Sequence, residues 1–291
     1  MLNSPELCLH VGYGKTGSTY LQAWLATQAK ALRTAGVHYP IPASGLGDSG
    51  NGHLLLEALA AADAPPPWLP AATSGTLLFS REHLARELSA PGACEQVAAW
   101  AQRWQLGPVK VLLLVREPQE HCYSLWAQKV KRAGERRSLE AFAEHYDAIT
   151  MVKHFVSEAL EAGFVIEVLD YGHHRRGLVP RFCQWLDTEA SFGRLPALQV
   201  SANPTPCHGQ LRLQRRLHPL WPGGTAPVPP AWMGWWLEPK GGLVAFAPER
   251  LHCWAEQAAD FNAFCAQSGV ISEGLPCGKG VLCNSRGIQL A

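Results

Sequence analysis

The sequence lacks several features that would assign a protein to a class at once. Its 291 residues contain no apolar run near the ~18 residues that a membrane-spanning helix needs. Met1 is not followed by the basic segment and apolar stretch of a secretory leader. Lys and Arg number 25 against 24 Asp and Glu, so a net charge of +1 creates no overall field for nucleic acid. We therefore expect a cytoplasmic protein with no membrane span and no nucleic-acid partner.

Cysteine is present but not arranged for metal or disulfide chemistry. The nine cysteines are odd in number and scattered, and none shows the spacing of zinc ligands. This pattern favours reduced, buried thiols and predicts no metal site. A link between Cys277 and Cys283 stays open.

Apolar runs and helical periodicity alternate along most of the chain, which predicts one α/β domain over residues 1–291. Residues 219–248 are rich in Pro, Gly and Trp, a composition that excludes a regular helix and suggests an insertion or lid. Residues 274–291 read as a loose tail. The expected strands are 7–12, 76–80, 109–115 and 164–170, and the expected helices are 18–35, 52–62, 81–88, 93–105, 118–133, 138–161, 177–187 and 249–268.

The stretch 7–22, LCLHVGYGKTGSTYLQ, carries the strongest functional signal. A β-prone run leads into a glycine-rich turn, and a helical pattern follows at once. Glycines let backbone N–H groups approach a ligand, and the first helical turn offers unpaired donors at the positive end of the helix dipole. This combination predicts a phosphate or sulfate site, for which the expected ligands are Gly14, Lys15, Thr16, Gly17, Ser18 and Thr19.

The spacing of this loop differs from that of a nucleoside-triphosphate loop. That pattern is G-x-x-x-x-G-K-[ST], and Leu9 stands where its first glycine should be. A second motif follows the run 109–115, where Arg116 and Pro118 precede Ser124 on the next predicted helix. Arginine forks two donors onto a phosphate, whereas a kinase or ATPase would place an Asp at this strand end to hold magnesium.

Together, G-x-x-K-T-G-S-T and the Arg-x-Pro…Ser segment resemble the sulfotransferases that use 3′-phosphoadenosine 5′-phosphosulfate (PAPS). The segments 76–84, 165–171 and 203–206 also resemble their later motifs, although Arg81 and Gly172 depart from the pattern. The resemblance covers about residues 7–217. It implies a three-layer α/β/α fold of the P-loop-like type with four or five parallel strands. It also implies that Lys15 stabilises charge on the leaving oxygen, and that Arg116 and Ser124 bind the 3′-phosphate.

The acceptor needs a general base, and two residues are candidates. His53 begins a predicted helix after a long loop, and imidazole suits proton removal near neutral pH. Glu82 lies just past a strand end, where α/β sheets carry active sites. His10 lies inside the first strand and is expected to be a hydrogen-bonded core residue.

These observations predict a PAPS-dependent sulfotransferase acting on a hydroxyl or amine of a small molecule or glycan. No metal is expected to be required, because Lys15, the loop amides and Arg116 would neutralise the donor. Two alternatives stay open, an ATP-dependent small-molecule kinase and a catalytically inactive nucleotide-binding protein on the same fold. A homodimer also stays open.

Overall fold

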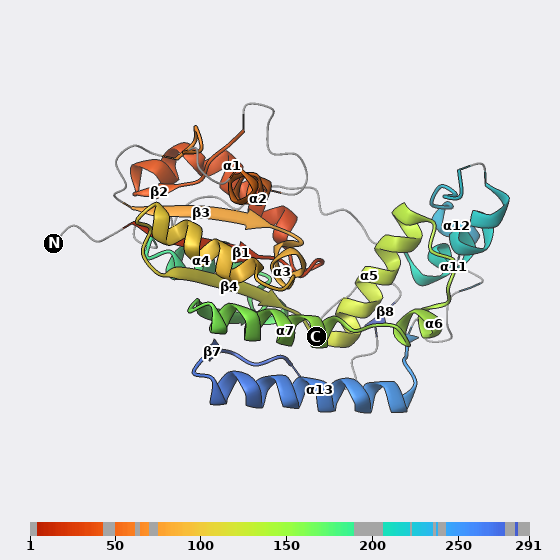
Figure 1. The fold of residues 1–291 in the computed structure, drawn as a ribbon. Coiled ribbons are helices and arrows are strands. Elements are labelled where there is room, and N and C mark those ends of the chain that lie inside the picture. The colour runs from red at the N-terminus through yellow and green to blue at the C-terminus, as the bar shows by residue number, and fades with distance from the viewer. Residues whose placement is uncertain are drawn as a thin grey trace. The chain divides into compact units, whose positions relative to one another are not determined.

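A computed structural model describes residues 5–42, 50–61, 65–69, 75–188, 206–221, 223–234, 237, 243–276 and 283–284. Six parallel strands form the central sheet in the order β2-β3-β1-β4-β5-β7 (Figure 1). The α/β class with a central parallel sheet is thereby confirmed. The strands are β1 Glu6–Val11, β2 Val37–His38, β3 Thr76–Arg81, β4 Val109–Val115, β5 Val165–Asp170 and β7 Ile271–Ser272.

The four predicted strands lie at the centre of this sheet, in the order β3-β1-β4-β5. The sheet exceeds the expected four or five strands because β2 and β7 extend its two edges. Each of these has only two residues, which is too short to leave a periodic signal in a sequence. A separate antiparallel pair joins β6 Leu243–Val244 to β8 Cys283–Asn284.

The predicted helices are present close to their expected ranges, with one exception, and the helices at Tyr171–His174, His208–Leu217 and Ala231–Gly234 were not predicted. Residues 138–161 form two helices, because the turn at Tyr146 carries short-range bonds from His145 and Tyr146 N–H back to Phe142 and Ala143. None of the described helices has the length and apolar character to cross a membrane. The helices are α1 Ser18–Thr34, α2 Gly52–Ala60, α3 Leu84–Leu88, α4 Ala93–Arg103, α5 Pro118–Ala133, α6 Leu139–Ala143, α7 Ala148–Glu161, α8 Tyr171–His174, α9 Leu178–Trp185, α11 His208–Leu217, α12 Ala231–Gly234 and α13 Pro248–Gln267, with a 3-10 turn η2 at His218–Leu220.

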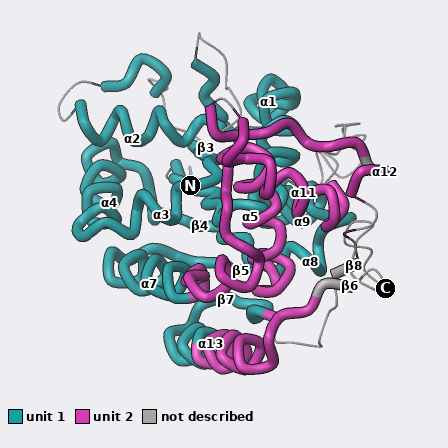
Figure 2. The backbone as a smooth tube through the Cα atoms, turned by 90° about the vertical axis from the view of Figure 1, so that its right-hand side faces the viewer, with its two compact units in different colours: residues 1–115, 150–200, 261–275 teal, residues 116–149, 201–260, 276–291 magenta. Residues whose placement is uncertain are grey.

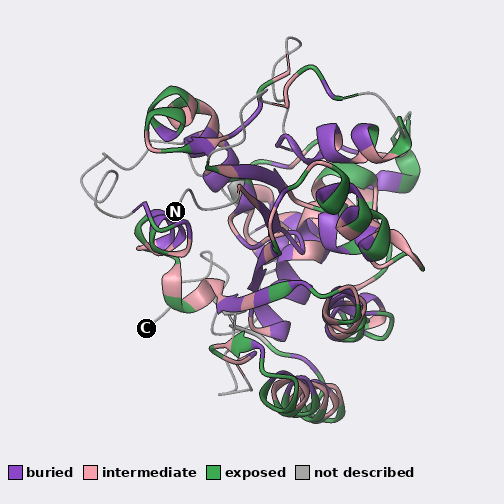
Figure 3. Ribbon diagram, turned by 60° about the vertical axis from the view of Figure 1, so that its left-hand side comes forward, coloured by how far each residue is buried: buried purple, intermediate pink, exposed green. Residues whose placement is uncertain are grey.

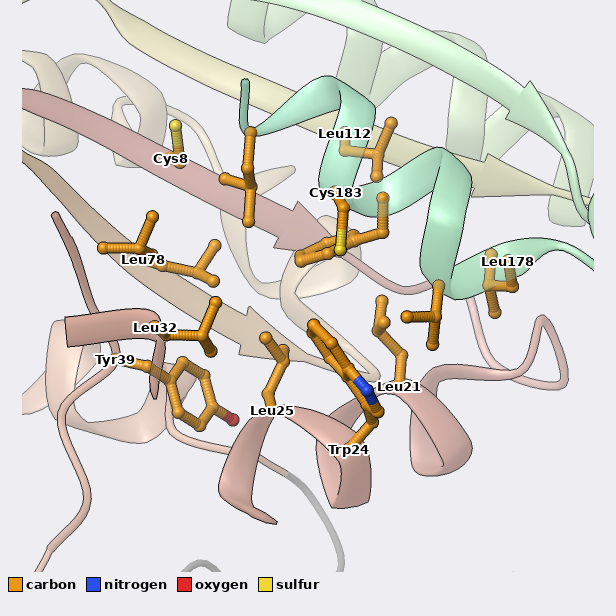
Figure 4. Packing of buried hydrophobic residues seen from close by; sticks show 14 of the residues in the cluster. Cys8, Leu21, Trp24, Leu25, Leu32, Tyr39, Leu78, Leu112, Leu178 and Cys183 are labelled. Atoms are coloured by element: carbon orange, nitrogen blue, oxygen red, sulfur yellow. The ribbon is translucent and has the colours of Figure 1, made fainter. Parts of the chain in front are cut away.

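Both faces of the sheet are covered, which explains why its strands read as continuous apolar runs. On one face, Cys8, Leu78 and Leu112 meet side chains of α1 and α9 (Figure 4). On the other face, Phe79 contacts Trp68, whose ring lies 6.2 Å from that of Trp100 on α4. Figure 3 accordingly shows the strands as mostly buried and the outer helices as half exposed. The predicted three layers are therefore present.

The chain divides into two compact units, each made of several segments (Figure 2). Unit 1 comprises residues 1–115, 150–200 and 261–275 and contains the parallel sheet. Unit 2 comprises residues 116–149, 201–260 and 276–291 and contains α5, α6, α11, η2 and α12. One domain over 1–291 stays a prediction, as does a lid at 219–248. The described part of that segment has only η2 and the four-residue α12, and Trp235, Trp236 and most of 274–291 lie outside the described residues.

Candidate active site

The loop between β1 and α1 has an unusual backbone. Gly14, Lys15 and Gly17 all adopt left-handed conformations, with φ of +84°, +53° and +80°. Lys15 is one of only three non-glycine residues with positive φ in the described chain, and such a conformation costs about 1 kcal/mol or more. Left-handed residues in such a turn allow neighbouring backbone N–H groups to point toward one ligand, which is the geometry found in anion-binding loops. The loop is anchored to the sheet, because the Gly12 N–H donates to the Arg81 carbonyl at 2.9 Å.

The start of α1 is well suited to bind a negative group. Its N-cap is Gly17, which offers no side-chain cap, and its first turn contains no acidic residue. An anion at this position would therefore take the place of the missing cap. Thr16 and Ser18 are buried, and their hydroxyl oxygens lie 3.5 Å apart, whereas Thr19 is exposed.

At two positions of the loop only glycine fits, because neighbouring atoms occupy the space that a Cβ would need. A Cβ on Gly12 would lie 2.8 Å from the Glu82 backbone, and one on Gly17 would overlap the ring of Tyr171. Tyr171 follows the carboxyl end of β5, so it brings an aromatic ring against the anion loop. Tyr171 was not among the predicted site residues, although its place at a strand end was the available signal.

Glu82, one of the two candidate bases, lies directly beside the loop. Its Oε1 accepts a hydrogen bond from the Lys15 N–H at 3.4 Å, and the same oxygen would be 3.9 Å from a Cβ on Gly14. His83, which follows Glu82 and is exposed, is also close to Gly14, because its Cε1 would be 3.8 Å from a Cβ at that position. A carboxylate here can accept a proton from a hydroxyl held at the loop.

His53, the other candidate base, lies at the first turn of α2 and is half buried. Its Nδ1 lies 3.1 Å from the Gly50 carbonyl oxygen. A carbonyl can only accept, so Nδ1 donates its hydrogen and the neutral ring keeps its lone pair on Nε2. Nε2 is therefore the atom of His53 that could remove a proton.

The segment that carries His53 is fixed to the same strand end as the anion loop. Gly50 forms an antiparallel bridge with Arg81, whose carbonyl accepts from Gly12. Asn51 is fully buried, donates to the carbonyls of Pro40 and Leu78, and accepts from the Ser80 N–H at 2.8 Å. The structure thus joins the anion loop, Glu82 and the His53 segment through the end of β3. Asn51 was missed in the sequence, where an Asn before Gly-His offered no distinguishing signal.

A buried polar cluster lies behind this strand end. Both amide atoms of Gln22 on α1 are buried without a hydrogen-bond partner among the described residues, and its carboxamide lies against Gly50. His10 is fully buried, its Nδ1 lies 2.8 Å from Ser80 Oγ, and burial lowers its pKa to about 3. The expectation that His10 is a hydrogen-bonded core residue is confirmed. The unsatisfied amide of Gln22 costs free energy unless a bound group or water reaches it.

Both departures from the sulfotransferase pattern have structural explanations. Arg81 pairs with Glu87 at 2.7 Å, and its side chain packs where Gly52 leaves room. Gly172 donates its N–H to the Asp170 carboxylate at 2.8 Å, and a Cβ there would lie only 3.2 Å from that oxygen. The two residues therefore stabilise the strand ends.

In unit 2, Arg116 lies directly after β4 and forms a buried ion pair. Its Nε and Nη2 each lie 3.0 Å from Glu120 Oε2, and both side chains are more than nine-tenths buried. Glu117 caps α5 by accepting from the Glu120 N–H, and burial raises its pKa to about 7. Ser124 lies on the same helix and is also buried. The phosphate-binding roles of Arg116 and Ser124 stay predictions.

Metal and disulfide chemistry have little support in the described residues. No group of three or more His, Cys, Asp or Glu side chains gathers there as a metal would require. Seven of the nine cysteines are free, and burial raises the pKa of the Cys8 and Cys94 thiols to about 12, which makes them poor nucleophiles. Cys277 lies outside the described residues, so the question of a link to Cys283 stays open.

Comparisons with known proteins leave the family open. No family model matches the chain, and no curated protein matches it. Among solved structures, a retinol dehydratase in complex with androsterone and the inactive cofactor PAP is similar over part of its length. The sequences are 14% identical, the TM-score is 0.33, and the match covers 62% of this chain and 59% of that one. We therefore base the functional argument on the residues of the site.

Proposed function

We propose that the protein transfers a sulfuryl group from PAPS to a hydroxyl or amine of a small-molecule or glycan acceptor. The observation that carries this proposal is the loop Gly12–Ser18, with three left-handed residues before an uncapped helix start. This geometry supports binding of a tetrahedral oxyanion. The lysine within the loop supplies a positive charge at the same place.

The loop residues and Lys15 would act on the donor. When bound, PAPS supplies an activated sulfuryl group, whose bond to the phosphate oxygen breaks as a bond to the acceptor forms. Lys15 would stabilise the negative charge that develops on that phosphate oxygen. The loop amides would hold the charged group and exclude water from it.

The acceptor proton would go to Nε2 of His53 or to the carboxylate of Glu82. Both are joined to the strand end that anchors the loop. The lone pair on His53 Nε2 and the closeness of Glu82 to Lys15 support these two candidates equally. Arg116 would bind the 3′-phosphate of the donor. A guanidinium has five N–H donors, so a phosphate could share it with Glu120.

Calorimetry with nucleotides tests this proposal. We expect 3′-phosphoadenosine 5′-phosphate to bind without magnesium and far more tightly than ADP, because only the former has the 3′-phosphate. Equal affinity for ADP would remove the assignment of the 3′-phosphate site. Binding of ATP that requires magnesium, together with phosphoryl transfer, would instead support a small-molecule kinase.

A further inference from the structure

Basic side chains are concentrated in one part of unit 2. Residues 129–140 and 208–217 contain eight Lys and Arg but only two Asp and Glu, an excess of six positive charges in a chain whose net charge is +1. The even charge balance of the whole chain therefore conceals a strong local field. The basic residues are Lys129, Lys131, Arg132, Arg136, Arg137, Arg212, Arg215 and Arg216.

Several of these side chains come close together, because α5 and α11 pack against each other within unit 2. The Arg215 guanidinium donates to the Arg136 carbonyl at 3.2 Å, and Gln214 donates to the Lys131 carbonyl at 3.5 Å. Burial lowers the pKa of Arg215, and the neighbouring charges of Arg216 and Arg212 lower it further. Similarly, burial and then Arg132 lower the pKa of Lys131. Arg137 pairs with Glu135 at 2.7 Å, and Glu135 and Glu140 partly offset the effect on Arg215. The remaining basic charges near Arg215 and Lys131 repel one another, and an anionic partner would relieve that repulsion.

Large apolar side chains are exposed next to this basic region. Leu220, Trp221 and Trp232 are 78%, 48% and 75% exposed. Leu220 ends the turn η2, which follows α11 directly, and Trp221 is the next residue. Trp232 lies on α12, which packs against the first turn of α11 through Gly234 and through the Gln210 bond to the Pro229 carbonyl. We use the name basic–apolar face for these three residues together with the eight basic ones.

We infer that the basic–apolar face docks the protein peripherally on an anionic lipid bilayer. Tryptophan is favoured at the headgroup level of a membrane, an exposed leucine enters the acyl region, and clustered arginines bind lipid phosphates. Sugars and nucleic-acid bases stack on aromatic rings, but they give no partner to an aliphatic side chain that is 78% exposed. Leu220 therefore favours the bilayer over a glycan or a nucleic acid.

Vesicle sedimentation with the full chain tests this inference. We expect binding to vesicles of equal parts phosphatidylglycerol and phosphatidylcholine, no binding to phosphatidylcholine alone, and weaker binding as salt increases. The triple variant R132Q/R136Q/R216Q removes three exposed charges, and its binding should fall on the order of 100-fold. The control K30Q/R33Q/R86Q changes the net charge equally in unit 1 and should bind like the parent.

A second variant separates a bilayer from other polyanions. L220S/W232S keeps every charge, and it should lose vesicle binding while its melting temperature stays that of the parent, because both side chains are exposed. The inference is overturned if L220S/W232S binds vesicles normally, or if both charge variants lose binding alike. Tighter binding to heparin or to a DNA oligonucleotide than to anionic vesicles would also overturn it.

Discussion

Arg116 illustrates how a residue proposed to bind a ligand can also be required for stability. Replacing Arg116 alone would leave the Glu120 carboxylate buried without its charged partner, at a cost of about 3–5 kcal/mol. A loss of activity in such a variant would therefore not distinguish a phosphate ligand from a structural residue.

The double variant R116Q/E120Q removes both charges and resolves this ambiguity. We expect it to fold, and to bind 3′-phosphoadenosine 5′-phosphate about 1.5–3 kcal/mol more weakly, because a charge-assisted contact is lost. Calorimetry measures the affinity, and the melting temperature of the double variant shows whether it is folded. Normal affinity in the double variant would show that Arg116 is only structural.

The two candidate bases can be compared with variants that keep their hydrogen bonds. In H53Q, the amide can still donate to the Gly50 carbonyl, and in E82Q the oxygen can still accept from the Lys15 N–H. The variant that removes the true base should lose about 10²–10⁴-fold in turnover with unchanged nucleotide affinity.

A nitrophenol acceptor provides the control for that comparison. Its hydroxyl is already acidic, so the loss in the base variant should shrink when it replaces an aliphatic alcohol. K15A should remain inactive with both acceptors, since it acts on the leaving group. Full activity of both H53Q and E82Q would mean that neither residue is the base.

His10 predicts a pH dependence of stability. Its pKa is about 3 in the folded protein, lowered from 6.5 by burial, so the unfolded chain binds a proton more readily. The contribution of His10 to the free energy of unfolding is therefore fully present above pH 6.5, and it is lost progressively as the pH falls toward 3. Acidification to about pH 5 should cost about 2 kcal/mol from this residue. Urea unfolding of the parent and of H10Q should show a flatter dependence in the variant, and identical slopes would contradict the assignment.

Among the elements, the glycines at the two ends of α1 allow the steric and conformational roles of glycine to be separated. Gly17 and Gly36 have φ of +80° and +82°, but a Cβ on Gly17 would overlap Tyr171, whereas nothing lies within 4 Å of one on Gly36. G36A should cost only the left-handed strain, about 1–2 kcal/mol.

G17A should cost more than G36A and should also weaken nucleotide binding, because Tyr171 or the loop must move. Melting temperatures and calorimetry of the two variants measure both effects. Equal destabilisation with unchanged nucleotide affinity in G17A would show that Tyr171 moves freely and that the loop tolerates the change.

On the scale of the whole molecule, the sheet predicts where stability is concentrated. β1 pairs along its length with both β3 and β4, and its residues from Leu7 to Val11 are at most 1% exposed. The edge strand β7 pairs with β5 alone and over only two residues. Amides of β1 should therefore exchange only through global unfolding, typically about 5–15 kcal/mol, and those of β7 much faster. Hydrogen exchange followed by mass spectrometry measures this order, and equal rates in β1 and β7 would contradict it.

The sequence alone determined the class of the fold and its four central strands, and it predicted the anion-binding role of the glycine-rich loop. Each of these depends on local patterns. A buried parallel strand is a continuous apolar run, and a glycine-rich turn can be recognised from its sequence. The two-residue edge strands depend on pairing with distant segments. The break at 144–147 is a local turn whose Tyr146 also contacts the distant residues His121 and Trp254. The sequence predicted neither feature. Only the tertiary structure brought Asn51, Tyr171 and Gln22 to the loop, joined His53 to Glu82 through β3, and paired Arg116 with Glu120. It also brought basic residues of α5 and α11 close together, because side chains about 80 positions apart become neighbours only when the helices pack.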